Sequence, residues 1–163
     1  LAQIPIRFRE VGPVQENMKE AICSIIWGGF GTGKTWAAYA LVKDLLSSGE
    51  IKSFKVLTEV GLINEIKAGF SDGTFSKRMK DLENVDLLIV DEIGKSNDTD
   101  FNKAQLFEIL NNRYNWMRRT VLICNATDKA HVREIMPTAT LDRFRENVIE
   151  MEGKSRRYNG QIS

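Results

Sequence analysis

Short apolar runs alternate along this chain with longer segments in which apolar residues recur every three or four positions. The continuous runs predict buried strands, and the spaced segments predict helices. The strands expected are 21–27, 53–58, 85–92, 120–125 and 147–151. The helices expected are 15–20, 36–47, 62–70, 77–82, 101–117, 131–136 and 141–145, with a loop at 71–74. Residues 1–12 have no such pattern, and we expect them to be irregular.

The longest helical segment, 101–117, has a marked apolar periodicity. It places on one face Phe101, Ala104, Phe107, Leu110 and Tyr114. Helices that alternate with strands predict an α/β fold with a central parallel five-stranded sheet covered on both faces, in three layers. Ligands of such sheets bind at the carboxyl ends of the strands. The residues at those ends are Gly28, Asp91, Glu92 and Asn125.

Composition narrows the possible functions only slightly. A chain of 163 residues with 42% hydrophobic residues is expected to form one domain, 1–163. Its net charge of +1 means that any nucleic-acid partner must bind a local basic patch. Cys23 and Cys124 lie in strand-like runs and are expected in the core, and a single histidine gives no support for a zinc site. Without a membrane-length apolar run or a signal peptide, we expect a cytoplasmic protein with no membrane partner.

Residues 28–35 read Gly-Gly-Phe-Gly-Thr-Gly-Lys-Thr and match the phosphate-binding pattern G-x-x-x-x-G-K-[ST]. A strand-like run precedes them and a helical segment follows, which argues against a merely structural glycine-rich turn. Backbone N–H groups of such a loop surround phosphates, and the helix amino terminus adds positive charge. The residues expected to bind a nucleoside triphosphate are Gly28, Gly29, Gly31, Thr32, Gly33, Lys34, Thr35 and Trp36. Lys34 would contact the β- and γ-phosphates, and Thr35 would ligate Mg²⁺.

The run that ends in Asp91-Glu92 resembles the second acidic motif of phosphate-loop enzymes. Asp91 is expected to hold Mg²⁺ through its water shell. Glu92 is placed to orient and deprotonate an attacking water, a catalytic role for which a kinase has no need. The alternative is that Glu92 only caps the following loop.

Two further residues are candidates for the reaction. Asn125, at the end of the next strand, is expected to sense the γ-phosphate or the water, although asparagine is also common in turns. Arg143, in Leu-Asp-Arg-Phe-Arg at 141–145, is a candidate arginine finger for a neighbouring subunit. From the residues alone, a surface arginine paired with Asp142 or Glu146 is the simpler interpretation of Arg143.

Together these motifs resemble the AAA+ ATPases, specifically the DnaC/DnaI helicase loaders and their transposition relative IstB. The resemblance covers nearly the whole chain. It rests on 4–8, 28–35, 87–94, 109–114, 120–125, 141–143 and the closing Glu-Gly-Lys-Ser-Arg-Arg at 152–157. It implies an ATP-dependent switch whose subunits assemble through the ATP site on single-stranded DNA, with Arg143 completing the adjacent site. It also implies a replicative hexameric helicase as partner, and a fold without the α-helical lid of larger AAA+ proteins.

The resemblance also implies a DNA-binding surface on segments 62–78 and 95–103. The candidates are Lys67, Phe70, Lys77, Arg78, Lys95 and Lys103, whose charges and one aromatic ring suit a nucleic-acid strand. A solvated charged face with Phe70 in the core is the alternative for each of them. Trp36 and Trp116 are expected to be packing residues.

We expect the chain to be a fragment of a longer loader that lacks its amino-terminal helicase-binding domain. Three other functions remain open: an IstB-like transposition ATPase acting on duplex DNA, a small-molecule kinase, and a nucleotide-gated module with negligible turnover. Glu92 and Asn125 argue against the kinase, and Glu92 argues for hydrolysis, which should be weak in an isolated domain.

Overall fold

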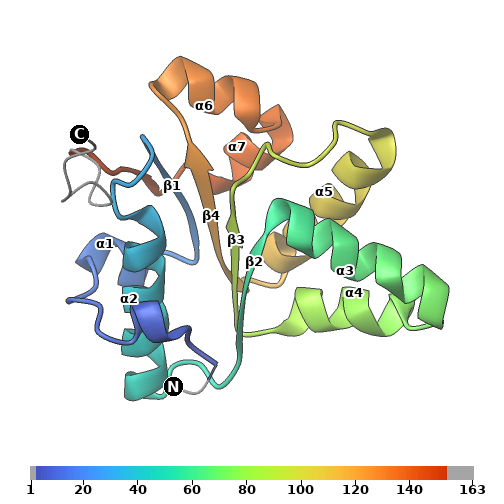
Figure 1. Cartoon of the computed structure of the whole chain (residues 1–163), viewed down its shortest axis with the longest axis horizontal. Coiled ribbons are helices and arrows are strands. Elements are labelled where there is room, and N and C mark those ends of the chain that lie inside the picture. The colour runs from blue at the N-terminus through green and yellow to red at the C-terminus, as the bar shows by residue number, and fades with distance from the viewer. Residues whose placement is uncertain (1–2, 154–163) are drawn as a thin grey trace, which may run out of the picture.

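The computed structural model describes residues 3–153, which form one parallel sheet with helices on both faces (Figure 1). Its strands are β1 Cys23–Gly28, β2 Phe54–Thr58, β3 Leu87–Asp91, β4 Arg119–Asn125 and β5 Val148–Glu150. They are ordered β2-β3-β4-β1-β5, and every neighbouring pair is parallel. The α/β class and the five-stranded parallel sheet predicted from the sequence are therefore confirmed.

The helices lie close to the predicted segments. They are the short 3-10 helix η1 Ile6–Phe8, α1 Glu16–Glu20, α2 Lys34–Ser48, α3 Glu59–Asp72, α4 Phe75–Asn84, α5 Asp100–Asn115, α6 Lys129–Ile135 and α7 Thr138–Phe144. The predicted loop at 71–74 is shorter than expected, because α3 continues to Asp72 before Gly73 ends it in the left-handed conformation. The Thr58 hydroxyl begins α3 by accepting a hydrogen bond from the Gly61 amide at 2.9 Å.

Alternating side chains of the central strands face two apolar cores. Ile26, Ile89 and Ile123 pack against α2 and the amino-terminal segment on one face. Ile25 and Leu88 pack on the other face, where α3 to α7 lie. The three layers are visible in Figure 1, with η1, α1 and α2 on one side of the sheet and α3 to α7 on the other. Within residues 3–153, no helix follows β5, so the described fold contains no α-helical lid.

The α5 helix packs with a different face from the one its aromatic residues suggested. Its buried residues are Asn102, Leu106, Ile109, Leu110 and Arg113. Of the predicted face, only Leu110 is buried, whereas Phe107 and Tyr114 are 39% and 42% exposed. Aliphatic side chains fill the space over the sheet, and the rings of Phe107 and Tyr114 lie beside Arg143 of α7 instead.

Arg113 is fully buried in the core. Its Nη1 donates to the carbonyl oxygens of Leu82 at 2.9 Å and Val85 at 2.8 Å, and its Nε donates to the Thr120 hydroxyl at 2.9 Å. Its Nη2 donates to the Arg119 carbonyl oxygen at 2.6 Å. Burial lowers the pKa of Arg113 to about 10, so the side chain stays charged at neutral pH. One guanidinium thus links the end of α4, α5 and the start of β4.

None of the helices in residues 3–153 is both long enough and apolar enough to cross a membrane. Cys124 is buried and Cys23 is partly buried, and burial raises the pKa of both thiols to about 11. Both cysteines therefore lie in or beside the core, as expected, and are protonated at neutral pH.

Candidate nucleotide-binding site

The glycine-rich loop connects the carboxyl end of β1 to the first turn of α2. Gly28 has a φ of 155°, and a Cβ added there would overlap the carbonyl oxygen of Met151. Gly33 caps α2 in the left-handed conformation with a φ of 92°. Another residue at either position would strain the backbone, and at Gly28 it would also displace the chain that follows β5. These two glycines are required by the shape of the loop.

Lys34 lies inside the loop and is 6% exposed. Its Nζ donates to the carbonyl oxygens of Gly28, at 3.2 Å, and Gly29, and to the Thr32 hydroxyl at 3.3 Å. The loop therefore surrounds an ammonium group with oxygen atoms. A triphosphate in the loop would offer phosphate oxygens to the same group.

Thr35 and Asp91 come together from α2 and β3. The Thr35 hydroxyl donates to Asp91 Oδ2 at 2.8 Å, although 56 residues separate them in the sequence. A hydroxyl and a carboxylate that converge in this way fit Mg²⁺, which prefers oxygen ligands and keeps most of its waters. Asp91 also accepts the backbone N–H of Glu92 at 2.7 Å, which fixes its second oxygen.

Glu92 is exposed and has a φ of 54°, in the left-handed region that non-glycine residues seldom adopt. Such backbone strain is found most often at functional sites. Within residues 3–153, its carboxylate makes no hydrogen bond and no ion pair, so the loop-capping alternative has no contact to support it.

A cavity of about 330 Å³ brings the predicted residues of one sheet edge together. It is lined by Lys34, Thr35, Asp91, Glu92 and Asn125, with Gly31, Gly33 and Trp36 of the loop and helix. Asn125 lies beside the loop because it pairs with Gly28 in the register of β1 and β4. Three of the strand-end residues predicted from the sequence, Asp91, Glu92 and Asn125, therefore line the same cavity as the glycine-rich loop.

Three lining residues were not assigned a role from the sequence: Arg7, Phe8 and Phe30. Phe8 stacks on Tyr39 with ring centroids 4.4 Å apart and meets Trp36 edge-on at 5.5 Å. These contacts fasten η1 to α2 beside the cavity and confirm Trp36 as a packing residue. The segment 4–8 carried part of the family resemblance, which was the one signal for it.

Glu59 is a further residue that sequence analysis missed. Although charged, it is 6% exposed, and it extends from α3 to the loop that follows Glu92. A glutamate in the first turn of a helix is ordinary, because it complements the helix dipole. Nothing in its sequence context indicated burial.

Arg143 lies away from the cavity of its own chain. Its Nε donates to Asn111 Oδ1 at 3.0 Å, and its Nη1 donates to the Ala139 carbonyl oxygen at 2.9 Å. The guanidinium lies 5.2 Å from the centroid of Phe107 and 5.9 Å from that of Tyr114. Any role in phosphate chemistry must therefore concern another copy of the chain. The predicted pairing with Asp142 or Glu146 is absent among the described residues, and it is Arg145 that pairs with Asp142, at 3.4 Å.

The two segments proposed for DNA binding lie side by side. Phe70 is 55% exposed, stacks on Phe75 and lies 5.8 Å from Phe101, whose ring also faces the ammonium of Lys67 at 5.9 Å. Lys95 is 5.9 Å from the ring centroid of Phe30, beside the phosphate loop.

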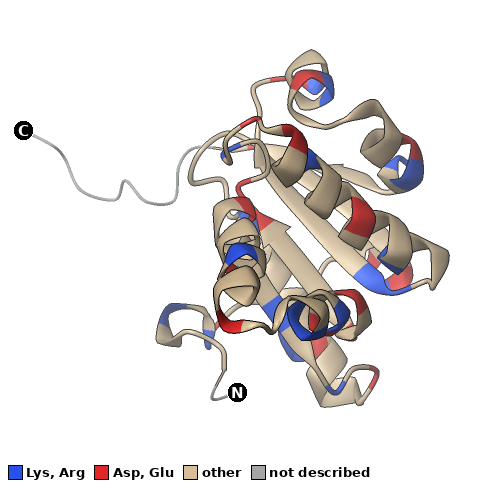
Figure 2. Ribbon diagram, turned by 90° about the vertical axis from the view of Figure 1, so that its right-hand side faces the viewer, with Lys and Arg blue, Asp and Glu red and all other residues tan. Residues whose placement is uncertain are grey.

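Not every candidate on this surface has a free charge. Lys77 forms an ion pair with Asp81 at 2.8 Å, and Arg78 forms one with Asp72 at 2.9 Å. Lys103 pairs with Asp98 at 2.7 Å. Acidic and basic residues are interspersed over the ribbon in Figure 2. Among these candidates, Lys67 and Lys95 have no ion-pair partner within residues 3–153.

The expectation that Trp116 is a packing residue is wrong, because its side chain is 79% exposed at the end of α5. The helix ends there in a turn, in which Met117 adopts a φ of 50°. Of the closing pattern at 152–157, residues 154–157 lie outside the described part of the chain.

The fold and this loop define a three-layer phosphate-loop NTPase of the AAA+ class. The sequence model of the IstB-like ATP binding protein family matches residues 16–162, and the chain belongs to that family. It is 32% identical over 133 residues to the replicative helicase loader DnaC of Escherichia coli (strain K12), covering 80% of this chain and 53% of the relative. The chain thus spans about half the length of this curated relative.

Proteins of known structure share the fold. A crystal structure of the DnaC helicase loader has a TM-score of 0.73 and 18% identity, covering 89% of this chain and 96% of that one. The structure of the replication initiator DnaA bound to AMPPCP and single-stranded DNA has a TM-score of 0.72 and 18% identity. The match covers 91% of this chain and 51% of that one. These comparisons confirm the predicted family and the AAA+ fold.

Proposed function

We propose that this chain binds ATP with Mg²⁺, hydrolyses it, and is the ATPase domain of a protein that loads a replicative helicase. The observation that carries the proposal is the convergence of Thr35, Asp91, Glu92 and Asn125 on one cavity beside the phosphate loop. The family membership and the similarity to a curated helicase loader support the biological role.

Each residue has a distinct part in the proposed reaction. The loop amides and Lys34 bind the triphosphate, and Thr35 and Asp91 hold Mg²⁺, which neutralises charge on the β- and γ-phosphates. Glu92 takes a proton from the water that attacks the γ-phosphorus, while the bond to the bridging oxygen breaks and ADP leaves. Asn125 hydrogen-bonds the γ-phosphate or the water and so responds to hydrolysis.

Assembly and partners follow from the same proposal. ATP lies between neighbouring subunits, Arg143 of one subunit reaches the site of the next, and the surface around Lys67 and Phe70 contacts single-stranded DNA. A hexameric helicase is the proposed protein partner, and the cytoplasm is the proposed location.

The second candidate function is a transposition ATPase on duplex DNA, which the IstB-like family match favours. Tighter binding of an oligo-dT strand than of a duplex of equal length would support the loader.

Glu92→Gln tests the catalytic step. The variant should bind ATP as the wild type does, because the cavity keeps its shape, but hydrolysis should fall by about 10²-fold or more. Titration with a fluorescent ATP analogue and phosphate release measure the two properties separately. Glu108→Gln, at an exposed position on α5, is the matched control and should change neither. Hydrolysis at the wild-type rate in Glu92→Gln would contradict the assignment.

A further inference from the structure

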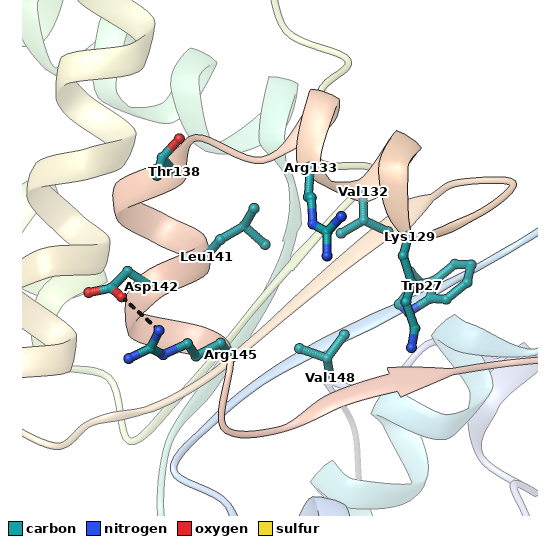
Figure 3. Close-up of a pocket in the computed structure, with 9 residues that line it drawn as sticks. All are labelled: Trp27, Lys129, Val132, Arg133, Thr138, Leu141, Asp142, Arg145 and Val148. Carbon is teal, nitrogen blue, oxygen red and sulfur yellow. Dashed lines mark ion pairs between the residues drawn. The ribbon is translucent and has the colours of Figure 1, made fainter.

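A second cavity, of about 470 Å³, lies between α6, α7 and the edge strand β5 (Figure 3). Its apolar lining consists of Trp27, Val132, Leu141 and Val148. Lys129, Arg133 and Arg145 surround these residues, together with Asp142 and Thr138. In Figure 3, Leu141 points from α7 towards the side chains of α6, and Val148 points up from β5. The cavity is thus a groove with an apolar floor and a basic rim.

The groove exists because α6 and α7 do not extend over the edge of the sheet. Val148 on β5 faces the groove and is 43% exposed, whereas Ile149, which faces the other core, is 7% exposed. Val148 therefore leaves part of the apolar floor of the groove open to contact by another chain. The groove is therefore a candidate docking surface.

The charges around the groove are available to a ligand. Lys129 and Arg133 are exposed and have no ion-pair partner within residues 3–153. Arg145 pairs with Asp142 at 3.4 Å, but their side chains are 74% and 65% exposed, so water weakens this pair strongly. Three cations face one carboxylate here, although the whole chain has a net charge of only +1.

We propose that this groove binds a peptide segment of a partner protein in which large apolar side chains are flanked by carboxylates. The apolar residues would cover Leu141 and Val148, and the carboxylates would pair with Lys129 and Arg133. An amphipathic helix seated in an apolar groove is a common form of such recognition.

A nucleic-acid strand fits this groove less well than a peptide. Strand binding uses exposed aromatic rings as stacking platforms. The one aromatic ring here, Trp27, is 4% exposed, and the other floor residues are aliphatic. Exposed aromatic rings lie elsewhere on the described chain, as at Phe70 on α3, which is 55% exposed. The groove also shares no lining residue with the nucleotide cavity, so its occupation can be tested apart from ATP binding.

The test uses a fluorescein-labelled peptide of about 16 residues with Leu at helical i, i+3, i+4, i+7 spacing and Glu elsewhere. Fluorescence anisotropy should show that it binds the wild-type chain. The double variant Lys129→Glu/Arg133→Glu should bind it at least about tenfold more weakly, because both rim cations become repulsive. Lys80→Glu, at an exposed position on α4, is the matched control and should bind normally. A peptide with Lys in place of Glu should not bind.

Amide chemical shifts locate the bound peptide. Those of Val132, Leu141 and Val148 should move on addition of the Glu peptide, while those of the phosphate loop should not. The proposal is overturned if the Glu and Lys peptides bind equally, or if the double variant binds as the wild type does. It is also overturned if oligo-dT, and not the peptide, shifts the groove resonances.

Discussion

The carboxylate of Glu59 accepts a hydrogen bond from the backbone N–H of Ser96 at 2.9 Å, across 37 residues of sequence. The same oxygen accepts the Gly94 N–H at 3.2 Å. On its other side, Gly94 lies so close to Ile135 that an added Cβ would come within 2.6 Å of it. The loop that follows Glu92 is therefore held between α3 and α6.

Glu59→Ala should impair catalysis without weakening ATP binding, because Glu59 positions the loop behind Glu92 and is not part of the nucleotide cavity. We expect the kcat of ATP hydrolysis to fall by about tenfold to a hundredfold, since small displacements of a catalytic group are costly. Loss of the buried acceptor should also lower the free energy of unfolding by about 1–3 kcal/mol. Steady-state kinetics and urea titration measure these effects.

The matched control for this variant is Glu65→Ala on the same helix. Glu65 pairs with Lys55 at 2.8 Å and has no contact with the loop, so its loss should leave kcat unchanged. Glu59→Gln, which retains one acceptor oxygen, should recover part of the lost rate. A wild-type kcat in Glu59→Ala would show that the loop does not depend on this carboxylate.

Lys34→Ala should weaken ATP binding by about a hundredfold or more, because the ammonium inside the loop is the charge that meets the phosphates. Isothermal titration calorimetry measures the loss. The control is Lys43→Ala on the same helix, where the ammonium contacts the exposed carbonyl oxygen of Arg9. Unchanged affinity in Lys34→Ala would contradict the nucleotide site itself.

Most residues that line the candidate nucleotide cavity were predictable, because a local loop motif and the strand ends contain them. The loop motif, the acidic pair and Asn125 are each local in sequence, and the parallel sheet places the ends of its strands at one edge. The depth of Lys34 in the loop and the left-handed φ of Glu92 were not predictable, because the residue pattern does not specify the detailed conformation of either loop.

Residues whose position depends on tertiary packing were missed or misplaced. Glu59 looks like an ordinary residue of a first helical turn, and only the fold places a loop beside it. Phe107 and Tyr114 are apolar enough to be assigned to a core, yet smaller aliphatic residues fill that space, and the rings face Arg143 instead. Hydrophobicity alone does not distinguish these two environments.

Arg143→Ala should leave ATP binding unchanged, because Arg143 does not line the cavity of its own chain. Hydrolysis stimulated by DNA should fall strongly, by about 10³-fold if the residue acts as an arginine finger for a neighbour. Arg145→Ala, two residues further along, is the control and should retain the stimulated rate.

A mixing experiment separates action in a neighbouring site from action within one chain. Arg143→Ala supplies an intact Glu92, and Glu92→Gln supplies an intact Arg143. Each variant alone should be inactive, and their mixture should regain part of the DNA-stimulated hydrolysis. A mixture that stays inactive would argue that Arg143 does not complete a neighbouring site.

Arg113→Met should destabilise the fold and leave the nucleotide cavity chemically intact. The substitution keeps much of the side-chain length but leaves the carbonyl oxygens of Leu82, Val85 and Arg119 without their buried donor. We expect the free energy of unfolding to fall by about 3–5 kcal/mol, as when one partner of a buried charged network is removed. Urea denaturation followed by circular dichroism measures it.

Arg118→Met is the control for this variant, because Arg118 is 41% exposed and lies 4.0 Å from Asp86 in a weak pair. Its loss should cost no more than about 1 kcal/mol. If both variants were equally stable, the buried guanidinium would contribute no more than a surface charge. In that case the connection between α4, α5 and β4 would rest on apolar packing alone, and Leu82→Ala, at a fully buried position, should then be the more damaging change.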